Sequence, residues 1–318
     1  MPTRKKRWLR IGAMSICVFG TTMRVPSQLT QNSEVVRKSV VFIYTKNPQG
    51  VEHPEGTGFL LFVPTKADPN RGYTILVTAR HMADPGWLNC PAQGDLVARF
   101  NKKVFNPQTD DVGTADYPLK GQQWIASDDS SVDIAYTFLN GGILQGLNVE
   151  NEPLRLSELP SSSEAKGVGI GASILSAGLL ENASGTKRNY PIFKFGNVSS
   201  IPDEKISVPG CGGTTKLLTE WMVAASLVPG NSGSPIVFVP QMLQPGRAFV
   251  LGVQSISFLG SDVAGMAPIR YLLESIRQLR LEDADLSKPV EDNPAPKPAP
   301  TSLAPSFPVK PGPLPAPK

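Results

Sequence analysis

The segment Gly230-Asn231-Ser232-Gly233 places one serine between two glycines, a pattern suited to nucleophilic chemistry. Flanking glycines allow a tight turn that leaves the hydroxyl exposed and directs neighbouring backbone N–H groups at a single point. A serine hydroxyl becomes an effective nucleophile only when a positioned base, usually histidine, takes its proton. A single copy of this pattern is more often only a turn, so the rest of the sequence must show whether this serine is catalytic.

The chain has two histidines, and their settings differ. His81 follows the apolar run 73–78, which places it at the end of a buried strand. There it is suited to act as a base or, alternatively, as a structural histidine that caps a strand. His53 stands beside Pro54 with no strand leading into it, and we expect it at the surface. His81 is therefore the candidate base.

Asp133 is an acid between the apolar residues Val132 and Ile134. A buried carboxylate is costly unless it is paired or well hydrogen-bonded, so Asp133 requires a partner such as an imidazole N–H. Asp128 and Asp129 precede it and are the competing acids, but their polar setting favours surface turns. Asp133 is the candidate that orients His81.

Short β-branched and aromatic runs, separated by Gly, Pro, Asn and Asp clusters, predict strands along most of the chain. In the first half they are 40–45, 58–63, 73–78, 96–104 and 132–139. In the second half they are 174–180, 191–198, 221–225, 235–239 and 249–255. The one segment with clear helical spacing is 271–281, and 146–164 is expected to connect the halves. Many short strands with one closing helix predict barrels or a sandwich, not a βαβ architecture.

The ends of the chain differ from its body. Six basic residues and no acid lie in the first 24 residues. Four of them, at 4–7, precede a short apolar stretch, 11–20, which is typical of a secretory signal. An uncleaved anchor or a basic arm are the alternatives. From Pro289 onward proline recurs, which predicts an extended, disordered tail that acts as a spacer. Without these ends, whose net charges are +6 and +1, the total of +4 leaves the body at −3, which gives no reason to expect nucleic-acid binding.

Cysteine and histidine spacing predicts no metal site, since none of the short spacings of zinc ligands is present. No phosphate loop or dinucleotide motif is found, so we expect no cofactor. After export, Cys90 and Cys211 would remain, either paired in a disulfide or as separate buried thiols. The sequence does not decide between these two states, and it does not predict an oligomeric state.

Taken together, the three motifs resemble those of the chymotrypsin-like (trypsin-fold) serine peptidases, especially bacterial members with a Gly-Asn-Ser-Gly serine loop. His81, Asp133 and Ser232 follow one another in that family's order, at intervals of 52 and 99 residues. The resemblance extends over about 40–279. It implies an all-β fold of two six-stranded antiparallel β-barrels with a C-terminal helix. The expected organisation is a signal peptide or basic segment (1–28), a first barrel (35–155), a second barrel with the helix (165–284) and the tail (289–318).

The resemblance also implies a role for each motif residue. Ser232 attacks the scissile carbonyl, His81 carries the proton, and Asp133 orients the imidazole. The backbone N–H groups of Gly230 and Ser232 form the oxyanion hole. The resemblance also implies four substrate-binding residues. Ser226 lies at the base of the pocket for the P1 residue, and Ser255, Ile256 and Ser257 lie on the strand that pairs with the substrate.

These assignments predict a secreted or periplasmic serine endopeptidase that acts on protein or peptide substrates and has no stable membrane span. Serine at position 226 offers no countercharge, so we expect small or apolar P1 residues rather than Lys or Arg. The alternative is a non-catalytic trypsin-fold module that binds protein segments. An esterase on an α/β fold is disfavoured, since Ser234 replaces the second glycine of its motif and the histidine precedes the serine.

Three residues depart from the family pattern. Asn231 stands where animal digestive members carry Asp, so a freed N-terminus finds no carboxylate to pair with and we predict no activation by that route. Ser234 stands where glycine is commonest, which adds a hydroxymethyl group behind the serine. Arg80 replaces the usual alanine before the histidine, and its charge requires solvent or an acidic partner.

Overall fold

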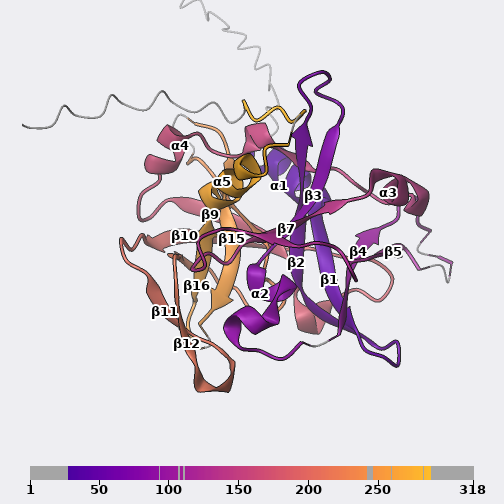
Figure 1. The fold of residues 1–318 in the computed structure, drawn as a ribbon, viewed down its shortest axis with the longest axis horizontal. Coiled ribbons are helices and arrows are strands. Elements are labelled where there is room, and N and C mark those ends of the chain that lie inside the picture. Colours follow the sequence, from indigo (N-terminus) through magenta and orange to yellow (C-terminus); the bar gives the residue numbers. More distant parts are fainter. Residues whose placement is uncertain are drawn as a thin grey trace, which may run out of the picture.

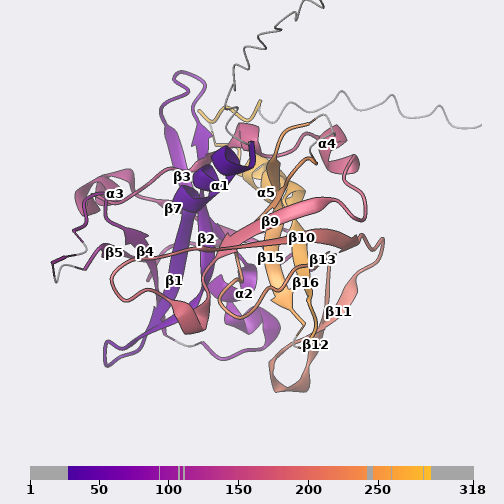
Figure 2. The ribbon, with the colours of Figure 1, turned by 180° about the vertical axis from the view of Figure 1, so that it is seen from behind.

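The computed structural model describes residues 28–287, except 93, 107, 110, 111, 242–245, 259 and 282. The expected signal or basic segment and the proline-rich tail lie outside the described residues, apart from Gln28. The strands of the first half and those of the second half form two groups that lie side by side (Figures 1 and 2). Helix α5 lies at one end of the second group, and the β11–β12 hairpin extends from the other end.

The first half folds into an eight-stranded sheet whose order is β5-β4-β1-β2-β3-β7-β6, with β8 paired to β2. Its strands are β1 (Val40–Lys46), β2 (Glu52–Pro64), β3 (Gly72–Thr78), β4 (Asp95–Asn101), β5 (Thr114–Pro118), β6 (Ile125–Ala126), β7 (Ala135–Leu139) and β8 (Leu154–Arg155). All pairs are antiparallel except β2 with β8. Successive residues of β2 face opposite sides of the sheet. Accordingly, Leu60 packs with Leu76 in one apolar cluster, whereas Phe59 and Leu61 belong to another.

The second half forms a closed barrel of six antiparallel strands in the order β10-β13-β16-β15-β14-β9. They are β9 (Ser173–Gly178), β10 (Ile192–Ser200), β13 (Trp221–Ala224), β14 (Pro235–Phe238), β15 (Phe249–Ser257) and β16 (Val263–Pro268). A separate hairpin of β11 (Ile206–Pro209) and β12 (Thr215–Leu218) projects from this half. Closure satisfies the backbone donors and acceptors of every strand in the ring, which makes the barrel a rigid support.

Five α-helices occur among the described residues: α1 (Gln28–Ser39), α2 (Arg80–Ala83), α3 (Gly141–Leu147), α4 (Ser162–Lys166) and α5 (Arg270–Gln278). The largest apolar cluster joins both halves. It contains Phe59 and Val77 from the first sheet, Val250 and Val253 from the barrel, and Leu272 of α5. Burial of this shared core fixes the two halves against each other and so sets the geometry of any site between them.

The all-β class, one closed six-stranded barrel and the C-terminal helix are confirmed. Where the first six-stranded barrel was expected, the first half forms an eight-stranded sheet. Each of the ten expected strands overlaps a strand of the structure. Strand 132–139 was predicted too long, because β7 begins at Ala135 and Asp133 lies in the irregular segment before it. The expectation of a single helix was wrong: α1 places Val36 in the shared core, although its overall polar composition conceals this.

Candidate active site

A cleft of about 910 Å³ lies between the halves and brings the candidate residues together. The first half contributes His81 and Asp133 to its lining, and the second half contributes Gly230 and Ser232. Apolar side chains from both halves complete the walls, among them Met82, Leu88, Leu96, Leu218 and Ile256. A concave, partly apolar surface with a few convergent polar groups is typical of a ligand or substrate site.

His81 and Asp133 form a hydrogen-bonded pair at this cleft. β3 ends at Thr78 and the chain turns directly into α2, which directs His81 towards the turn before β7. Nδ1 of His81 lies 2.7 Å from Oδ2 of Asp133, and the backbone N–H of His81 donates to Oδ1 at 2.9 Å. An N–H at Nδ1 leaves Nε2 as the acceptor, which is the tautomer that a general base requires.

Asp133 and His81 also shift each other's pKa. Burial opposes charge on Asp133, but attraction to His81 and hydrogen bonds from His81 and Ser255 bring the Asp133 pKa below its usual value. Burial likewise opposes charge on His81, and the charge and hydrogen bond of Asp133 outweigh it, so the His81 pKa is raised. The carboxylate therefore stays ionised beside an imidazole that accepts protons more readily than a free one.

Ser232 lies in a loop whose backbone conformation requires glycine on both sides of the serine. Gly230 and Gly233 have φ angles of 93° and 86°, in the left-handed region. A Cβ on Gly233 would lie 2.0 Å from the carbonyl oxygen of Thr57. The backbone N–H of Thr57 in turn donates to Ser232 O at 2.8 Å. The serine loop of the second half is therefore packed directly on β2 of the first.

The hydroxyl of Ser232 donates to the carbonyl oxygen of Ser255 at 3.3 Å. Among the described residues it makes no hydrogen bond to His81. The backbone N–H groups of Gly230 and Ser232 likewise donate to no other described residue, so both are available to a bound oxyanion. Nucleophile and base are often loosely aligned when no substrate is bound.

The structure places the four expected substrate-binding residues in three settings. Ile256 and Ser257 line the cleft beside Ser232. Ser255 also lines the cleft, and its hydroxyl donates to Oδ2 of Asp133 at 2.6 Å. Ser226 is exposed and lies outside the lining of the cleft, with its hydroxyl 3.1 Å from Oδ1 of Asp262.

Sequence reasoning missed an acid close to this centre. Glu220, just before β13, is 1% exposed, and neither carboxyl oxygen has a hydrogen-bond partner among the described residues. Burial raises its pKa well above the ordinary value, and the Asp133 charge raises it further. Glu220 is therefore a neutral acid beside a charged one, since two buried like charges would repel. No sequence motif marks it, because it lies in the short link between β12 and β13 without a distinctive neighbour.

The structure also explains two departures from the family pattern. The hydroxyl of Ser234 is accommodated by Gly178, where a Cβ would lie 2.0 Å from Oγ. Arg80 lies over the ring of Trp87, with Cζ 5.2 Å from the ring centroid. Lys216 of β12 also contacts this ring, with Nζ 4.2 Å from its centroid. The charge of Arg80 is thus placed on an aromatic face instead of an acid.

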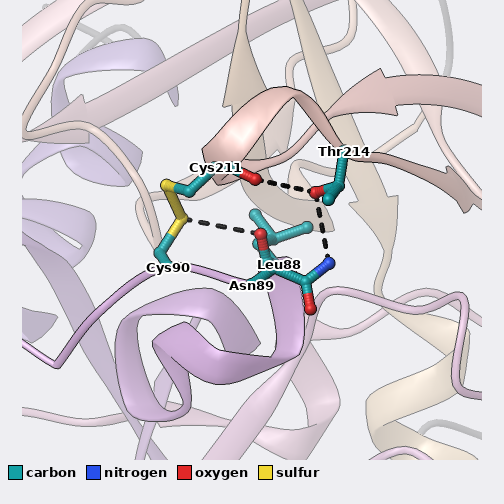
Figure 3. The surroundings of a disulfide bond; sticks show 5 residues. All are labelled: Leu88, Asn89, Cys90, Cys211 and Thr214. Atoms are coloured by element: carbon teal, nitrogen blue, oxygen red, sulfur yellow. Dashed lines mark hydrogen bonds between the residues drawn. A yellow bond between two sulfur atoms is a disulfide. The ribbon is translucent and has the colours of Figure 1, made fainter.

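Cys90 and Cys211 form a disulfide, which settles the alternative that the sequence left open. The bond joins the segment after α2, nine residues beyond His81, to the β11–β12 hairpin of the second half (Figure 3). Beside it, Asn89 Nδ2 donates to Oγ1 of Thr214 at 3.1 Å. Cys90 lines the cleft, so this covalent link closes one side of the site.

His53 departs from its expected setting. It lies within β2 and not in a loop, although it is exposed as expected. It lines the cleft together with Glu55 and Glu181. Within the described ranges, no group of three or more His, Cys, Asp and Glu side chains is arranged to hold a metal ion. No helix in this part of the chain is long and apolar enough to cross a membrane.

No protein-family model matches the sequence, and no curated protein matches it. Three crystal structures of the Rv3671c protease from M. tuberculosis are similar to this chain. The active form has a TM-score of 0.44 and 14% identity, covering 87% of this chain and 95% of that one. A serine-to-alanine mutant in the inactive form has a TM-score of 0.42, 15% identity and coverage of 77% and 89%. The inactive form has a TM-score of 0.41, 15% identity and coverage of 80% and 96%. We take the function from the geometry of the site and not from likeness at this level.

Proposed function

We propose that this protein is a serine endopeptidase that hydrolyses peptide bonds through Ser232, His81 and Asp133. The observation that carries the proposal is the 2.7 Å contact of His81 Nδ1 with a buried carboxylate, in the same cleft as a serine on a glycine-flanked turn. A buried acid that fixes the tautomer of a histidine is costly to maintain, and general-base catalysis uses that arrangement. The free N–H groups of Gly230 and Ser232 support an oxyanion role.

The proposed reaction has two stages. Ser232 Oγ attacks the peptide carbonyl while Nε2 of His81 takes its proton, and the oxyanion is held by the two N–H groups. His81 then gives this proton to the leaving amine, which departs and leaves an acyl-enzyme. Water then attacks the ester while His81 takes a proton from it, and His81 returns this proton to Ser232 Oγ as the acid product leaves. Asp133 stabilises the imidazolium at both stages without taking its proton.

A fluorophosphonate probe tests this function directly, because it labels only an activated serine. The proposal requires stoichiometric labelling of the wild-type protein, and the variants Ser232→Ala and His81→Ala should not be labelled. Ser257→Ala, which alters a neighbouring cleft hydroxyl, is the matched control and should still be labelled. Labelling that survives in Ser232→Ala would place the nucleophile elsewhere.

The specific observation that favours the second candidate, a non-catalytic module that binds protein segments, is the orientation of the Ser232 hydroxyl towards Ser255 O. This candidate predicts no labelling of the wild-type protein together with saturable binding of extended peptides. Ser232→Ala would then leave the peptide affinity unchanged.

For specificity we propose small or apolar P1 residues, supported by the apolar side chains along the cleft. Asp262 beside Ser226 supplies a negative charge that the sequence did not indicate. Cleavage profiling with a peptide library tests the proposal. Cutting after Lys or Arg that is lost in Asp262→Asn would contradict it and assign selectivity to that carboxylate.

We further propose that the protein acts outside the cytoplasm, secreted or periplasmic. The disulfide between Cys90 and Cys211 supports this location, because such bonds persist in oxidising compartments. Fractionation of expressing cells, with thiol alkylation before and after reduction, tests the proposal. A protein that remains in the cytoplasm with two free thiols would contradict it.

A further inference from the structure

Lys194 lies on β10 and binds the loop that leads to Ser232. Its ammonium group donates to Ser226 O at 2.5 Å and to Oδ1 of Asn231 at 2.9 Å. β10 belongs to the closed barrel, so the lysine is anchored on a rigid element. The proposed mechanism assigns no role to this contact.

Asn231 is the central residue of this loop and is 1% exposed. In addition to Lys194, its Oδ1 accepts from the backbone N–H of Val228 at 3.0 Å. Its Nδ2 donates to Leu179 O, just beyond the end of β9, at 3.0 Å. One side chain therefore joins β9, β10 and the loop itself. Its position, between Gly230 and Ser232, places this junction between the two oxyanion donors.

The surroundings of the Lys194 ammonium group oppose its positive charge. Burial lowers the Lys194 pKa, which means that the surroundings disfavour the charged form. The ammonium group is compensated by two oxygens, one a backbone carbonyl and one a side-chain amide. Hydrogen bonds from a charged donor are roughly twice as strong as those between neutral groups. Lys194 thus provides a stronger anchor for the loop than a neutral side chain would.

The loop requires such an anchor because its shape is unusual. Gly230 adopts a φ angle of 93°, and glycine loses more conformational freedom on folding than any other residue. On its other side the Gly230 carbonyl accepts from Thr57 Oγ1 at 2.7 Å. Lys194 of β10 and Thr57 of β2 therefore both hydrogen-bond to the loop.

We propose that Lys194 is a positioning residue for the oxyanion hole: by binding Ser226 O and Asn231, it fixes the backbone N–H groups of Gly230 and Ser232 in the orientation that catalysis needs. The proposal rests on the proposed function, because the oxyanion matters only to a hydrolase. It also gives a physical basis for the expectation that a freed N-terminus does not activate this protein. The Lys194 ammonium group already supplies a cation beside Asn231.

A purely structural lysine makes a different prediction. It would alter the free energy of unfolding and leave kcat unchanged in the protein that remains folded. A positioning residue instead changes kcat, since the oxyanion hole binds the transition state, and changes KM little. Amide hydrogen exchange of 227–231 provides a second readout, which does not depend on turnover.

The test compares Lys194→Met, which keeps the length and removes the donor, with Lys194→Arg and with Lys166→Met. Lys166 is an exposed lysine at the end of α4, so its replacement makes the same charge change away from the cleft. We expect Lys194→Met to lower kcat about 10- to 100-fold, the scale of a misplaced catalytic donor. KM should stay within about threefold, and amides 227–231 should exchange faster. Lys194→Arg should restore most of kcat, and Lys166→Met should match the wild type.

Asn231→Asp provides a second, independent variant. Beside Lys194 the new carboxylate gains an ion pair, but it loses the Nδ2 donor to Leu179 O. This variant is therefore expected to fold with somewhat reduced stability. In the double variant Asn231→Asp with Lys194→Met, the carboxylate is buried without a cation. Its free energy of unfolding should therefore fall by far more than the sum of the losses in the two single variants. Additive effects on stability would show that the two side chains are not coupled, and would overturn the proposal.

The outcomes separate this inference from the proposed function. If the wild type shows no labelling or peptide cleavage, but Lys194→Met still speeds exchange of 227–231, the lysine anchors the loop and the hydrolase assignment fails. If the wild type is active and Lys194→Met retains its kcat and exchange rates, the inference is overturned and the hydrolase assignment stands.

Discussion

Ser255, on a strand of the second half, donates a 2.6 Å hydrogen bond to the carboxylate of Asp133 in the first half. The contact crosses the boundary between the halves at the residue that orients His81. It therefore couples the packing of the two halves to the charge state of the site.

Ser255→Ala should lower kcat/KM about tenfold, because it removes one donor from a buried carboxylate and leaves the others to compensate. The free energy of unfolding should fall by about 1–2 kcal/mol for the same reason. Steady-state kinetics and urea unfolding measure the two effects. Ser176→Ala is the control, because it removes another buried hydroxyl that lies outside the cleft lining and has no hydrogen-bond partner among the described residues. Equal losses in both variants would contradict the specific role of Ser255.

Asp133→Asn should reduce kcat by about four orders of magnitude, the loss that an inverted histidine tautomer causes in such triads. In the wild type, kcat/KM should fall as the pH drops through the raised pKa of His81, since the protonated imidazole cannot act as a base. The acid limb of Asp133→Asn should move to lower pH, because the attraction that raises the His81 pKa is gone. An unshifted acid limb would mean that another group controls the profile.

Glu220 should make stability depend on pH above the ordinary range of carboxyl titration. Its pKa is raised in the folded protein, so its neutral form stabilises folding fully below the unfolded value. That contribution is lost as the pH rises towards the folded value, with a limiting slope of about 1.4 kcal/mol per pH unit. Glu220→Gln should remove this slope in urea unfolding measured from pH 4 to 9.

The exposed Glu204 provides the control, and Glu204→Gln should keep the slope of the wild type. The same Glu220→Gln variant should be more stable than the wild type at the alkaline end, because the cost of a buried charge is gone. If the two variants show the same pH dependence, Glu220 is not the group responsible.

Replacing Cys90 and Cys211 together with serine should destabilise the protein by about 5 kcal/mol, given their sequence separation of 121 residues. Activity should also fall, because the link joins the segment after α2 to the second half beside the cleft. Thermal unfolding with and without reductant measures the first effect, and the serine variant should no longer respond to reductant. A wild type that is equally stable in both conditions would show that the bond contributes nothing.

The order of the motifs and the strand pattern were sufficient to predict the fold class and the residues that meet in the cleft. His81, Asp133 and Ser232 could be found because each has an unusual setting: a polar residue at the end or within an apolar run, or between glycines. Glu220 and Lys194 have no such local signal. Their importance comes from burial and from partners distant in sequence, such as Lys194 with Asn231, which only the folded barrel brings together.

The same limit applies to Ser226 and to the disulfide. Counting residues back from Ser232 placed Ser226 in the cleft, whereas the structure has it exposed beside Asp262. Loop length determines such positions, and a motif alone does not fix the path of the loop. The pairing of Cys90 with Cys211 depends on the β11–β12 hairpin, which sequence patterning did not reveal.

Gly178 and Ser234 form a pair that explains why serine is tolerated behind the nucleophile. A Cβ on Gly178 would lie 2.0 Å from Ser234 Oγ and 2.9 Å from Asn231 Nδ2 and Thr57 Oγ1. Gly178→Ala should therefore destabilise the protein by about 1–3 kcal/mol, the cost of overpacking a filled site, and should lower kcat through the displaced serine loop. Urea unfolding and active-site titration measure both effects.

The double variant Gly178→Ala with Ser234→Gly tests whether the clash is the cause. Removing the hydroxymethyl group relieves the closest contact, so the double variant should recover most of the stability lost in Gly178→Ala. The remaining contacts with Asn231 and Thr57 should keep it slightly below the wild type. Ser234→Gly alone leaves the backbone intact and should retain activity. Strictly additive losses in the double variant would mean that Gly178 is required for a reason other than room for Ser234.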